Sequence, residues 1–266
     1  DVLVNDFVVI ATGSKPSNLP FLPFDHQVVL SSDDMLNLQN LPQNLAIIGA
    51  GVIGLEFASM MTDFGVDVTV IEAGERIAPT ESKTVAKTLK QDLETRGVTF
   101  HEKVQLSAED ISQQDDVIEI KIAESEQRFD KVLVAIGRKP RTEDIGLNNT
   151  KIQTTDKGHI ITNDYQQTAD QHIYAAGDCV GKLQLAHVGS KEGMVAVEHM
   201  FDQTPLPINY QIMPRCIYTQ PEVASLGLNV EEAKAEGYKA KAVKVPFKAI
   251  GKAVIEDTKN QSGFCE

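Results

Sequence analysis

Short apolar runs alternate with amphipathic stretches along the chain, and glycines separate them. Residues 45–49 form an apolar run that predicts a buried strand, and residues 52–64 have the spacing of a helix. Gly65 stands where this helix is expected to end. Residues 67–72, DVTVIE, are rich in β-branched side chains and predict a second strand. This order predicts a βαβ unit.

A second crossover helix is predicted in the sequence ESKTVAKTLKQDLETRG. Val85, Leu89 and Leu93 recur on one face of it, and Gly97 stands at the expected C-terminal cap. Strand-like segments follow at residues 98–101, 117–122 and 129–136. The alternation of strands and helices predicts an α/β fold, in which residues 42–142 form one doubly wound, Rossmann-like domain.

The segments on either side of this domain have a looser pattern. We expect a strand near residues 8–13, a short Ser-capped helix in SSDDMLNL, short strands around GHIIT and HIYAAGD, and a helix at about 187–201. From residue 209, the capped helix NVEEAKAEG and the alternating KAKAVKVPF and GKAVIED predict an α+β module. Domain boundaries are therefore expected near residues 41, 142 and 208.

Composition and charge argue against several classes of function. A chain of 266 residues, 42% hydrophobic, can bury one large core or two smaller ones. Its formal net charge of −13 disfavours nucleic acid and anionic membranes as partners, because phosphate binding needs clustered Lys and Arg. The first residues have neither the basic n-region nor the cleavage site of a signal peptide, and no apolar run approaches the roughly 20 residues that span a bilayer, so we expect a cytoplasmic protein.

The cysteines and the ends of the sequence lead to two further expectations. Cys179, Cys216 and Cys265 lie far apart, without the spacing of a metal pair or a disulfide framework, so no metal site is expected. The first strand begins within a few residues of the start, and SGFCE stops at the onset of another strand. We therefore expect the chain to be the central part of a longer protein.

The sequence IIGAGVIGLE contains the pattern GxGxxG at Gly49, Gly51 and Gly54. It follows a predicted strand and opens a predicted helix, and Glu72 ends the next strand about 20 residues later, which is the context of the dinucleotide-binding fingerprint. Gly49 would allow the tight turn, Gly51 the close approach of a pyrophosphate, and Gly54 the packing of the helix on the sheet. The alternatives are a turn that only packs, or the glycine-rich loop of an adenosylmethionine enzyme.

The residue at the end of the second strand bears on the choice of dinucleotide. Glu72 can accept hydrogen bonds from ribose hydroxyls, whereas a 2′-phosphate would meet like charge, so NAD is favoured over NADP. Arg76 is the one nearby residue that could favour the 2′-phosphate, and we interpret it as a solvated loop charge. The candidate contacts of the pyrophosphate are the loop and the helix N-terminus, namely Gly49, Ala50, Gly51, Val52, Ile53, Gly54 and Leu55.

Three further segments accompany the glycine-rich loop. These are VVIATGS, VAIGRKP and TADQHIYAAGD. Together with the loop they resemble the pyridine-nucleotide disulfide oxidoreductases, in which an NAD domain is inserted into an FAD domain, and the resemblance covers nearly the whole chain. It implies that residues 1–41 and 143–208 belong to the FAD-binding domain, 42–142 to the NAD-binding domain and 209–266 to the start of a truncated dimerisation domain.

The resemblance also implies which residues contact the two cofactors. Asp178 would bind the ribitol of FAD, and the ATGS turn would touch the same cofactor. Glu56 would lie toward the nicotinamide, and Val104 and Gly137 would line the NAD site. The other residues that the resemblance assigns to FAD are Thr12, Gly13 and Ser14 of that turn and Gln184, Leu185, Ala186 and His187 of the segment QLAH, at a helix N-terminus.

Within the family, the chain is most similar to the dihydrolipoamide dehydrogenase branch, through IEAGERIAPTESKTVAKTLKQDL, YTQPEVASLGLNVEEAKAEGY and VPFKAIGKA. This implies oxidation of the dihydrolipoyl group of an acyltransferase in a 2-oxo acid dehydrogenase complex, with FAD and NAD, by a homodimer. Mercuric, coenzyme A disulfide and glutathione reductases, transhydrogenase and NADH oxidase are the enzyme alternatives. A non-catalytic nucleotide-binding module is the alternative of another class.

The catalytic residues of the family have no counterpart in this sequence. No two of the three cysteines have the CxxxxC spacing of the redox pair, and none of the six histidines stands in the HPT context of the family's His–Glu base. We therefore expect no catalytic residue here, weak or lost FAD binding, and no activity of the chain alone.

Overall fold

The computed structural model describes residues 4–114, 117–256 and 263–266. Contacts divide the chain into two compact units, each built from two separate stretches. We call residues 18–137 with 216–266 the sheet unit, and residues 1–17 with 138–215 the α4 unit, after its long helix α4 (Ala186–Met200). Of the helices in the described ranges, none combines the length and the apolar character that crossing a bilayer requires.

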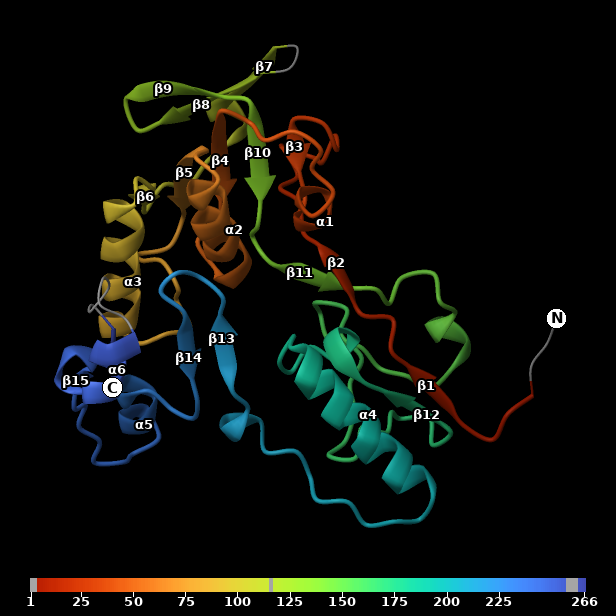
Figure 1. The fold of residues 1–266 in the computed structure, drawn as a ribbon. Coiled ribbons are helices and arrows are strands. Elements are labelled where there is room, and N and C mark those ends of the chain that lie inside the picture. Colours follow the sequence, from red (N-terminus) through yellow and green to blue (C-terminus); the bar gives the residue numbers. More distant parts are fainter. Residues whose placement is uncertain (1–3, 115–116, 257–262) are drawn as a thin grey trace. The chain divides into compact units, whose positions relative to one another are not determined.

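A five-stranded parallel sheet forms the centre of the sheet unit (Figure 1). Its strand order is β3-β10-β4-β5-β6. Along the chain the strands are β3 (Val29–Leu30), β4 (Asn44–Ile48), β5 (Asp67–Glu72), β6 (Thr99–Glu102) and β10 (Lys131–Val134). The order β6-β5-β4-β10 is the third-second-first-fourth arrangement of a dinucleotide-binding half, so the Rossmann-like class is confirmed.

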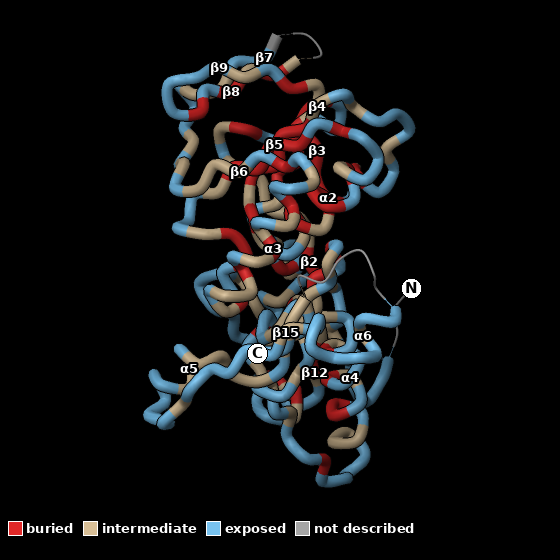
Figure 2. The backbone as a smooth tube through the Cα atoms, turned by 60° about the vertical axis from the view of Figure 1, so that its left-hand side comes forward, coloured by how far each residue is buried: buried red, intermediate tan, exposed pale blue. Residues whose placement is uncertain are grey.

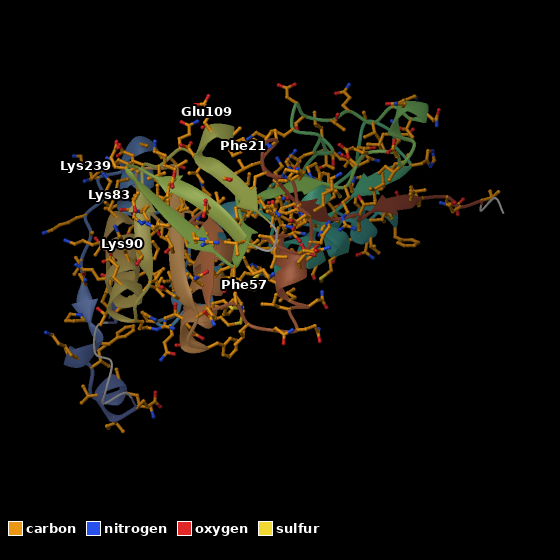
Figure 3. The ribbon with its side chains drawn as sticks, turned by 90° about the horizontal axis from the view of Figure 1, so that it is seen from above. Phe21, Phe57, Lys83, Lys90, Glu109 and Lys239 are labelled. Carbon is orange, nitrogen blue, oxygen red and sulfur yellow. The ribbon has the colours of Figure 1, made fainter. Side chains whose placement is uncertain are left out.

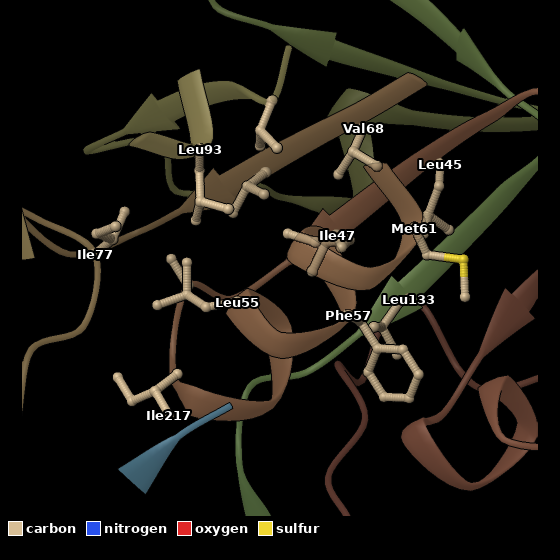
Figure 4. Close-up of a cluster of buried hydrophobic side chains, with 14 of the residues drawn as sticks. Leu45, Ile47, Leu55, Phe57, Met61, Val68, Ile77, Leu93, Leu133 and Ile217 are labelled. Carbon is tan, nitrogen blue, oxygen red and sulfur yellow. The ribbon is translucent and has the colours of Figure 1, made fainter. Parts of the chain in front are cut away.

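Two helices cover one face of this sheet. α2 (Val52–Asp63) and α3 (Lys83–Thr95) are the two predicted crossover helices. Leu55, Phe57 and Met61 of α2 and Leu93 of α3 pack with strand residues such as Ile47 (Figure 4). The buried face of α3 is Ala86, Leu89 and Leu93, while Val85 is only half-buried. Figure 2 shows how buried residues concentrate in the strands of this sheet and in α2.

An antiparallel three-stranded sheet covers the other face. It consists of β7 (Ile111–Gln114), β8 (Val117–Ile122) and β9 (Ser125–Phe129). Ile118, Ile120 and Ile122 are buried and pack with Ala46 and Val132 of the parallel sheet. The sequence predicted one strand over residues 129–136, whereas Phe129 ends β9 and a new strand, β10, begins at Lys131.

Residues 18–41 differ from the sequence-based domain division. We expected them in the FAD-binding domain, but they lie in the sheet unit, because β3 pairs in parallel with β10 and Val28 and Val29 are buried in its core. The predicted Ser-capped helix is α1 (Ser32–Met35). Ser31 and Asp34 form its capping box.

The α4 unit contains two small strand pairs beside α4. β1 (Val8–Ile10) runs parallel to β12 (Ile173–Ala175), and β2 (Ser14–Pro16) runs antiparallel to β11 (Arg138–Pro140). Cys179 and Val180 pack with Ile160 and Ala175 in its core. The strand expected in GHIIT is reduced to a single bridge between Thr154 and Ile160.

Short elements make up the C-terminal segment. Their bounds are β13 (Arg215–Ile217), β14 (Val223–Ser225), α5 (Val230–Ala235), β15 (Val245–Pro246), α6 (Gly251–Glu256) and β16 (Phe264–Cys265). The capped helix predicted in NVEEAKAEG is α5, with Asn229 as its N-cap. The strand predicted in GKAVIED is wrong, because Gly251–Glu256 form α6, where Lys252 pairs with Glu256 one turn later at 2.7 Å; Asp257 lies outside the described residues.

Candidate nucleotide-binding sites

The glycine-rich turn between β4 and α2 has two tight positions and one open position. A methyl group added at Gly49, whose φ is +105°, would lie 2.5 Å from the carbonyl oxygen of Ala135. At Gly54 it would collide with the carbonyl oxygen of Gly49. At Gly51 it would meet no atom within 4 Å. The fold itself therefore requires Gly49 and Gly54, whereas Gly51 leaves room for a ligand beside the backbone.

The N-terminus of α2 is open beside this turn. Gly51 is the N-cap, and no side chain caps the helix. The first N–H groups of a helix have no partner within the helix, and the macrodipole places partial positive charge there. Val52, the first helical residue, is 37% exposed. Such an end fits an anionic group such as a pyrophosphate.

Glu72 joins this turn to the loop that follows β5. Its carboxylate accepts hydrogen bonds from the backbone N–H of Ala50 at 2.7 Å and of Gly74 at 2.6 Å. The N–H of Ala50, which we assigned to the dinucleotide, is therefore directed to Glu72. Each carboxylate oxygen has a second lone pair, so Glu72 retains the capacity to accept from ribose hydroxyls.

Arg76 is held by the loop on which it lies. Its guanidinium donates to the carbonyl oxygens of Ala78 at 2.9 Å, Pro79 at 3.0 Å and Glu81 at 2.8 Å. Three backbone acceptors thus orient this side chain, which we had interpreted as a solvated charge. These bonds use three of the five N–H groups of the guanidinium and hold it on its own loop.

The other residues assigned to NAD lie around the same end of the sheet unit. Val104 donates its N–H to the carbonyl oxygen of Glu72 at 3.0 Å. Gly137 follows β10, is exposed, and has a φ of +118°. Glu56 accepts a hydrogen bond from the N–H of Tyr218 at 2.9 Å. The sequence did not indicate this contact, because Tyr218 lies in the C-terminal segment.

In the α4 unit, Ser14 and Asp178 come together although they are far apart in sequence. The Ser14 hydroxyl donates to Asp178 Oδ2 at 2.5 Å, and Arg138 Nε donates to Ser14 Oγ at 2.7 Å. Gly13, with a φ of +71°, makes the turn before Ser14. The two segments that the resemblance assigned to FAD thus meet in one place. Arg138 was missed, although it directly follows Gly137 in the quoted VAIGRKP.

The segment QLAH leads into a second open helix N-terminus. Leu185 is the N-cap of α4, and no side chain caps the helix. Gln184, Ala186 and His187 are exposed, as is Thr12 of the ATGS turn. A helix end of this kind stabilises a neighbouring group with partial negative charge.

Cys179 follows Asp178 but points into the core. Its thiol is buried and lies 3.2 Å from the carbonyl oxygen of Ala176 and 3.4 Å from that of Ile10. Burial raises the pKa of this thiol above its ordinary value. A buried thiol that stays protonated is a structural residue and not a nucleophile.

Comparison with known families decides the relationship. Residues 3–193 match the model of a family described as pyridine nucleotide-disulphide oxidoreductase, and residues 213–266 match the dimerisation domain of the same description. The chain belongs to the pyridine nucleotide-disulphide oxidoreductases. The resemblance seen in the sequence is thereby confirmed.

Curated members of the family include relatives of high identity. A dihydrolipoyl dehydrogenase of Bacillus subtilis (strain 168) is 45% identical over 259 residues, which are 96% of this chain and 54% of the relative. A dihydrolipoyl dehydrogenase of Chlamydia pneumoniae is 40% identical over 95% of this chain and 54% of its own length. The chain thus spans about half the length of the curated relatives it matches.

Solved structures of the family have the same fold. LpdA from Mycobacterium tuberculosis superposes with a TM-score of 0.89 at 27% identity, over 97% of this chain and 56% of LpdA. The HOCl-induced flavoprotein disulfide reductase RclA from Escherichia coli superposes with a TM-score of 0.87 at 26% identity, over 97% of this chain and 59% of RclA. The α/β class predicted from the sequence is therefore the fold of known disulfide oxidoreductases.

Proposed function

We propose that this chain provides the NAD-binding domain and flavin-contacting segments of a dihydrolipoamide dehydrogenase, an enzyme that oxidises dihydrolipoamide with NAD through FAD. The observation that carries the proposal is the open position at Gly51, beside an uncapped helix N-terminus and backed by Glu72. The names of the curated relatives support the dithiol dihydrolipoamide as the substrate over the disulfide substrates of other family members.

NAD would lie across the end of the parallel sheet with its pyrophosphate at the N-terminus of α2. The backbone at Gly51, Val52 and Ile53 supplies N–H groups there. Glu72 accepts from the adenosine ribose hydroxyls, and Arg76 stays on its own loop carbonyls, so the site favours NAD over NADP. Glu56 would lie toward the nicotinamide, and Gly137 would line the NAD site.

FAD would use the α4 unit. Asp178, oriented by the Ser14 hydroxyl, fits the hydrogen-bonding demand of the ribitol hydroxyls. The N-terminus of α4 fits the flavin ring, because partial positive charge there stabilises negative charge on the ring. When bound, FAD supplies the two-electron chemistry that links a dithiol to a nicotinamide.

The thiol half of the reaction is not assigned to any residue of this chain. Cys179 is buried with a raised pKa, and the three cysteines lie far apart in sequence. We infer that the chain alone does not oxidise dihydrolipoamide. The match of residues 213–266 to a dimerisation domain supports a homodimer, with the dihydrolipoyl group of an acyltransferase as the substrate.

The test is a calorimetric titration of the purified chain with NADH and, in parallel, with NADPH. We expect NADH to bind and NADPH to bind at least about tenfold more weakly, which corresponds to about 1.4 kcal/mol. Glu72→Ala removes the ribose acceptor and loosens the glycine turn, so NADH binding weakens by about tenfold or more.

Glu75→Ala is the matched control on the same loop, because this side chain is exposed and pairs only with the exposed Lys103 in the described ion pairs. It should leave NADH affinity unchanged. Equal affinity for the two dinucleotides would contradict the specificity, and binding of neither would contradict the assignment of the glycine turn. A flavin fluorescence titration of the same protein tests the FAD site separately.

A further inference from the structure

The α4 unit contains a buried carboxylate that none of the preceding assignments uses. Glu192 lies on α4 and is 1% exposed. One carboxylate oxygen accepts the N–H of Gly177 at 2.6 Å, and the other accepts the hydroxyl of Tyr210 at 2.8 Å. A buried carboxylate is rare in proteins unless its oxygens are satisfied, and both of these are.

The environment of Glu192 indicates a specific role rather than filling of space. Burial raises the pKa of Glu192, opposed by the hydrogen bonds from Gly177 and Tyr210 and by the charge of Lys182. Tyr210 is itself held by Gln166, whose amide donates to the hydroxyl at 3.2 Å. An apolar side chain would bury here at lower cost, so the role of this carboxylate lies in its hydrogen bonds.

The two hydrogen-bonded partners connect elements that the proposed FAD site needs together. Gly177 begins η3 (Gly177–Cys179), the turn that presents Asp178 toward Ser14. Glu192 belongs to the helix whose N-terminus is formed by residues 185–187. Gly189 brings the helix and the turn into close approach, because a methyl group at Gly189 would lie 3.1 Å from the Cα of Gly177.

We propose that Glu192, oriented by Tyr210, is a positioning residue of the flavin site. It fixes the Gly177–Asp178 turn against α4, and so fixes the ribitol-binding carboxylate relative to the helix N-terminus that faces the flavin ring. This inference rests on the proposed FAD site. Glu192 acts only through the backbone of Gly177 and the Tyr210 hydroxyl.

Three substitutions test the hydrogen bonds directly. Glu192→Gln keeps an oxygen that accepts from Gly177, Glu192→Leu removes both acceptors at similar volume, and Tyr210→Phe removes the group that orients Glu192. Amide hydrogen exchange at Gly177, followed by NMR, needs no cofactor. Flavin fluorescence titration reports the FAD dissociation constant, and NADH titration reports on the sheet unit.

In Glu192→Leu we expect exchange at Gly177 to accelerate, and the FAD dissociation constant to rise, each by about tenfold. Glu192→Gln should keep the exchange rate and the FAD dissociation constant close to those of the wild type. For Tyr210→Phe both quantities should lie between those of Glu192→Leu and those of the wild type. NADH affinity should not change in any of them. The rescue by Gln distinguishes hydrogen bonding from packing, because Leu fills the space as well as Gln does.

A matched glycine pair on α4 tests the close approach. Gly189→Ala places a methyl group against the turn and should weaken FAD binding, whereas Gly193→Ala places it in open space and should not. The positioning role of Glu192 would be overturned if Glu192→Leu left amide exchange at Gly177 unchanged. It would also be overturned if Glu192→Leu and Glu192→Gln accelerated that exchange equally. Failure of the wild-type chain to bind FAD would agree with the weak or lost FAD binding expected of this chain alone, and exchange at Gly177 would then decide the role of Glu192.

Discussion

At the scale of single residues, the three glycines of the turn between β4 and α2 serve different requirements. Gly49 needs a positive φ and approaches Ala135, and Gly54 approaches Gly49 so closely that no side chain fits. Gly51 has neither constraint. The fingerprint already assigns a turn, a ligand approach and a packing contact to these three positions. The coordinates show the tight turn at Gly49 and the close packing at Gly54.

This difference predicts opposite effects for two alanine substitutions. Gly51 has a φ of −78°, which alanine adopts readily, so Gly51→Ala should leave the free energy of unfolding nearly unchanged and weaken NADH binding. Gly54→Ala should lower the free energy of unfolding by about 1–3 kcal/mol through overpacking. Urea denaturation and NADH titration of both variants measure this. Loss of stability in Gly51→Ala would show that the open position serves packing.

In the α4 unit, the sequence indicated some of the residues that meet but not the contacts between them. Ser14 and Asp178 were named separately, each from its own motif. Their hydrogen bond, and the part of Arg138 in it, depend on the pairing of β2 with β11, which no local pattern contains.

At the scale of elements, strong periodicity of apolar residues predicted well which helices and strands exist. β5 was predicted with the observed bounds, and α2 and α3 lie where their apolar spacing placed them. The break between β9 and β10 was missed because it depends on Asp130, whose backbone N–H bonds to the side chain of Asn44 and whose carboxylate accepts from the N–H of Gln43. Those partners are distant in sequence, so the continuous apolar pattern of residues 129–136 gives no sign of them.

Arg96 joins several elements at the C-terminal cap of α3. Its guanidinium donates to Ser59 and to Asp63 of α2, and to the carbonyl oxygen of Gln220 in the C-terminal segment. Lys83 and Lys90, labelled in Figure 3, lie on α3 as well. Because the Arg96 side chain is only 22% exposed, these contacts are partly shielded from water.

We predict that Arg96→Ala lowers the free energy of unfolding by about 2 kcal/mol, since it leaves several acceptors without their charged donor. Arg96→Lys should recover part of this loss, because an ammonium cannot reach all these acceptors at once. Arg128→Ala is the control, because Arg128 forms an exposed ion pair with Glu119 and should contribute less than about 0.5 kcal/mol. Equal losses for Arg96 and Arg128 in urea denaturation would disprove the role of Arg96.

At the scale of the whole molecule, the two units have separate cores of different extent. The sheet unit buries both faces of its parallel sheet, whereas the core of the α4 unit centres on residues around Ala175 and Cys179. The division between units could not be placed from sequence. β3 is only two residues long, and its partner β10 lies about a hundred residues later, so nothing near Val29 shows that it belongs to the parallel sheet.

We predict that hydrogen exchange resolves the two units. The central strands β4 and β5 should exchange most slowly, and the α4 unit faster, because amide protection follows the extent of burial. NADH at a hundred times its dissociation constant adds about 2.7 kcal/mol to the unit that binds it, so protection should rise in the sheet unit. An equal rise in both units would show that the dinucleotide does not act through the sheet unit alone.

The double hydrogen bonding of Glu72 has a consequence for attempts to redesign the nucleotide preference of this protein. In dinucleotide-binding folds an acidic residue at this position favours NAD, and a nearby basic residue accommodates the 2′-phosphate of NADP. Here the same carboxylate also ties down the N–H groups of Ala50 and Gly74, so its removal frees two turns at once. We therefore expect that a change of the proposed nucleotide preference needs a second substitution that restores those two bonds, because residue 72 also holds its neighbours in place.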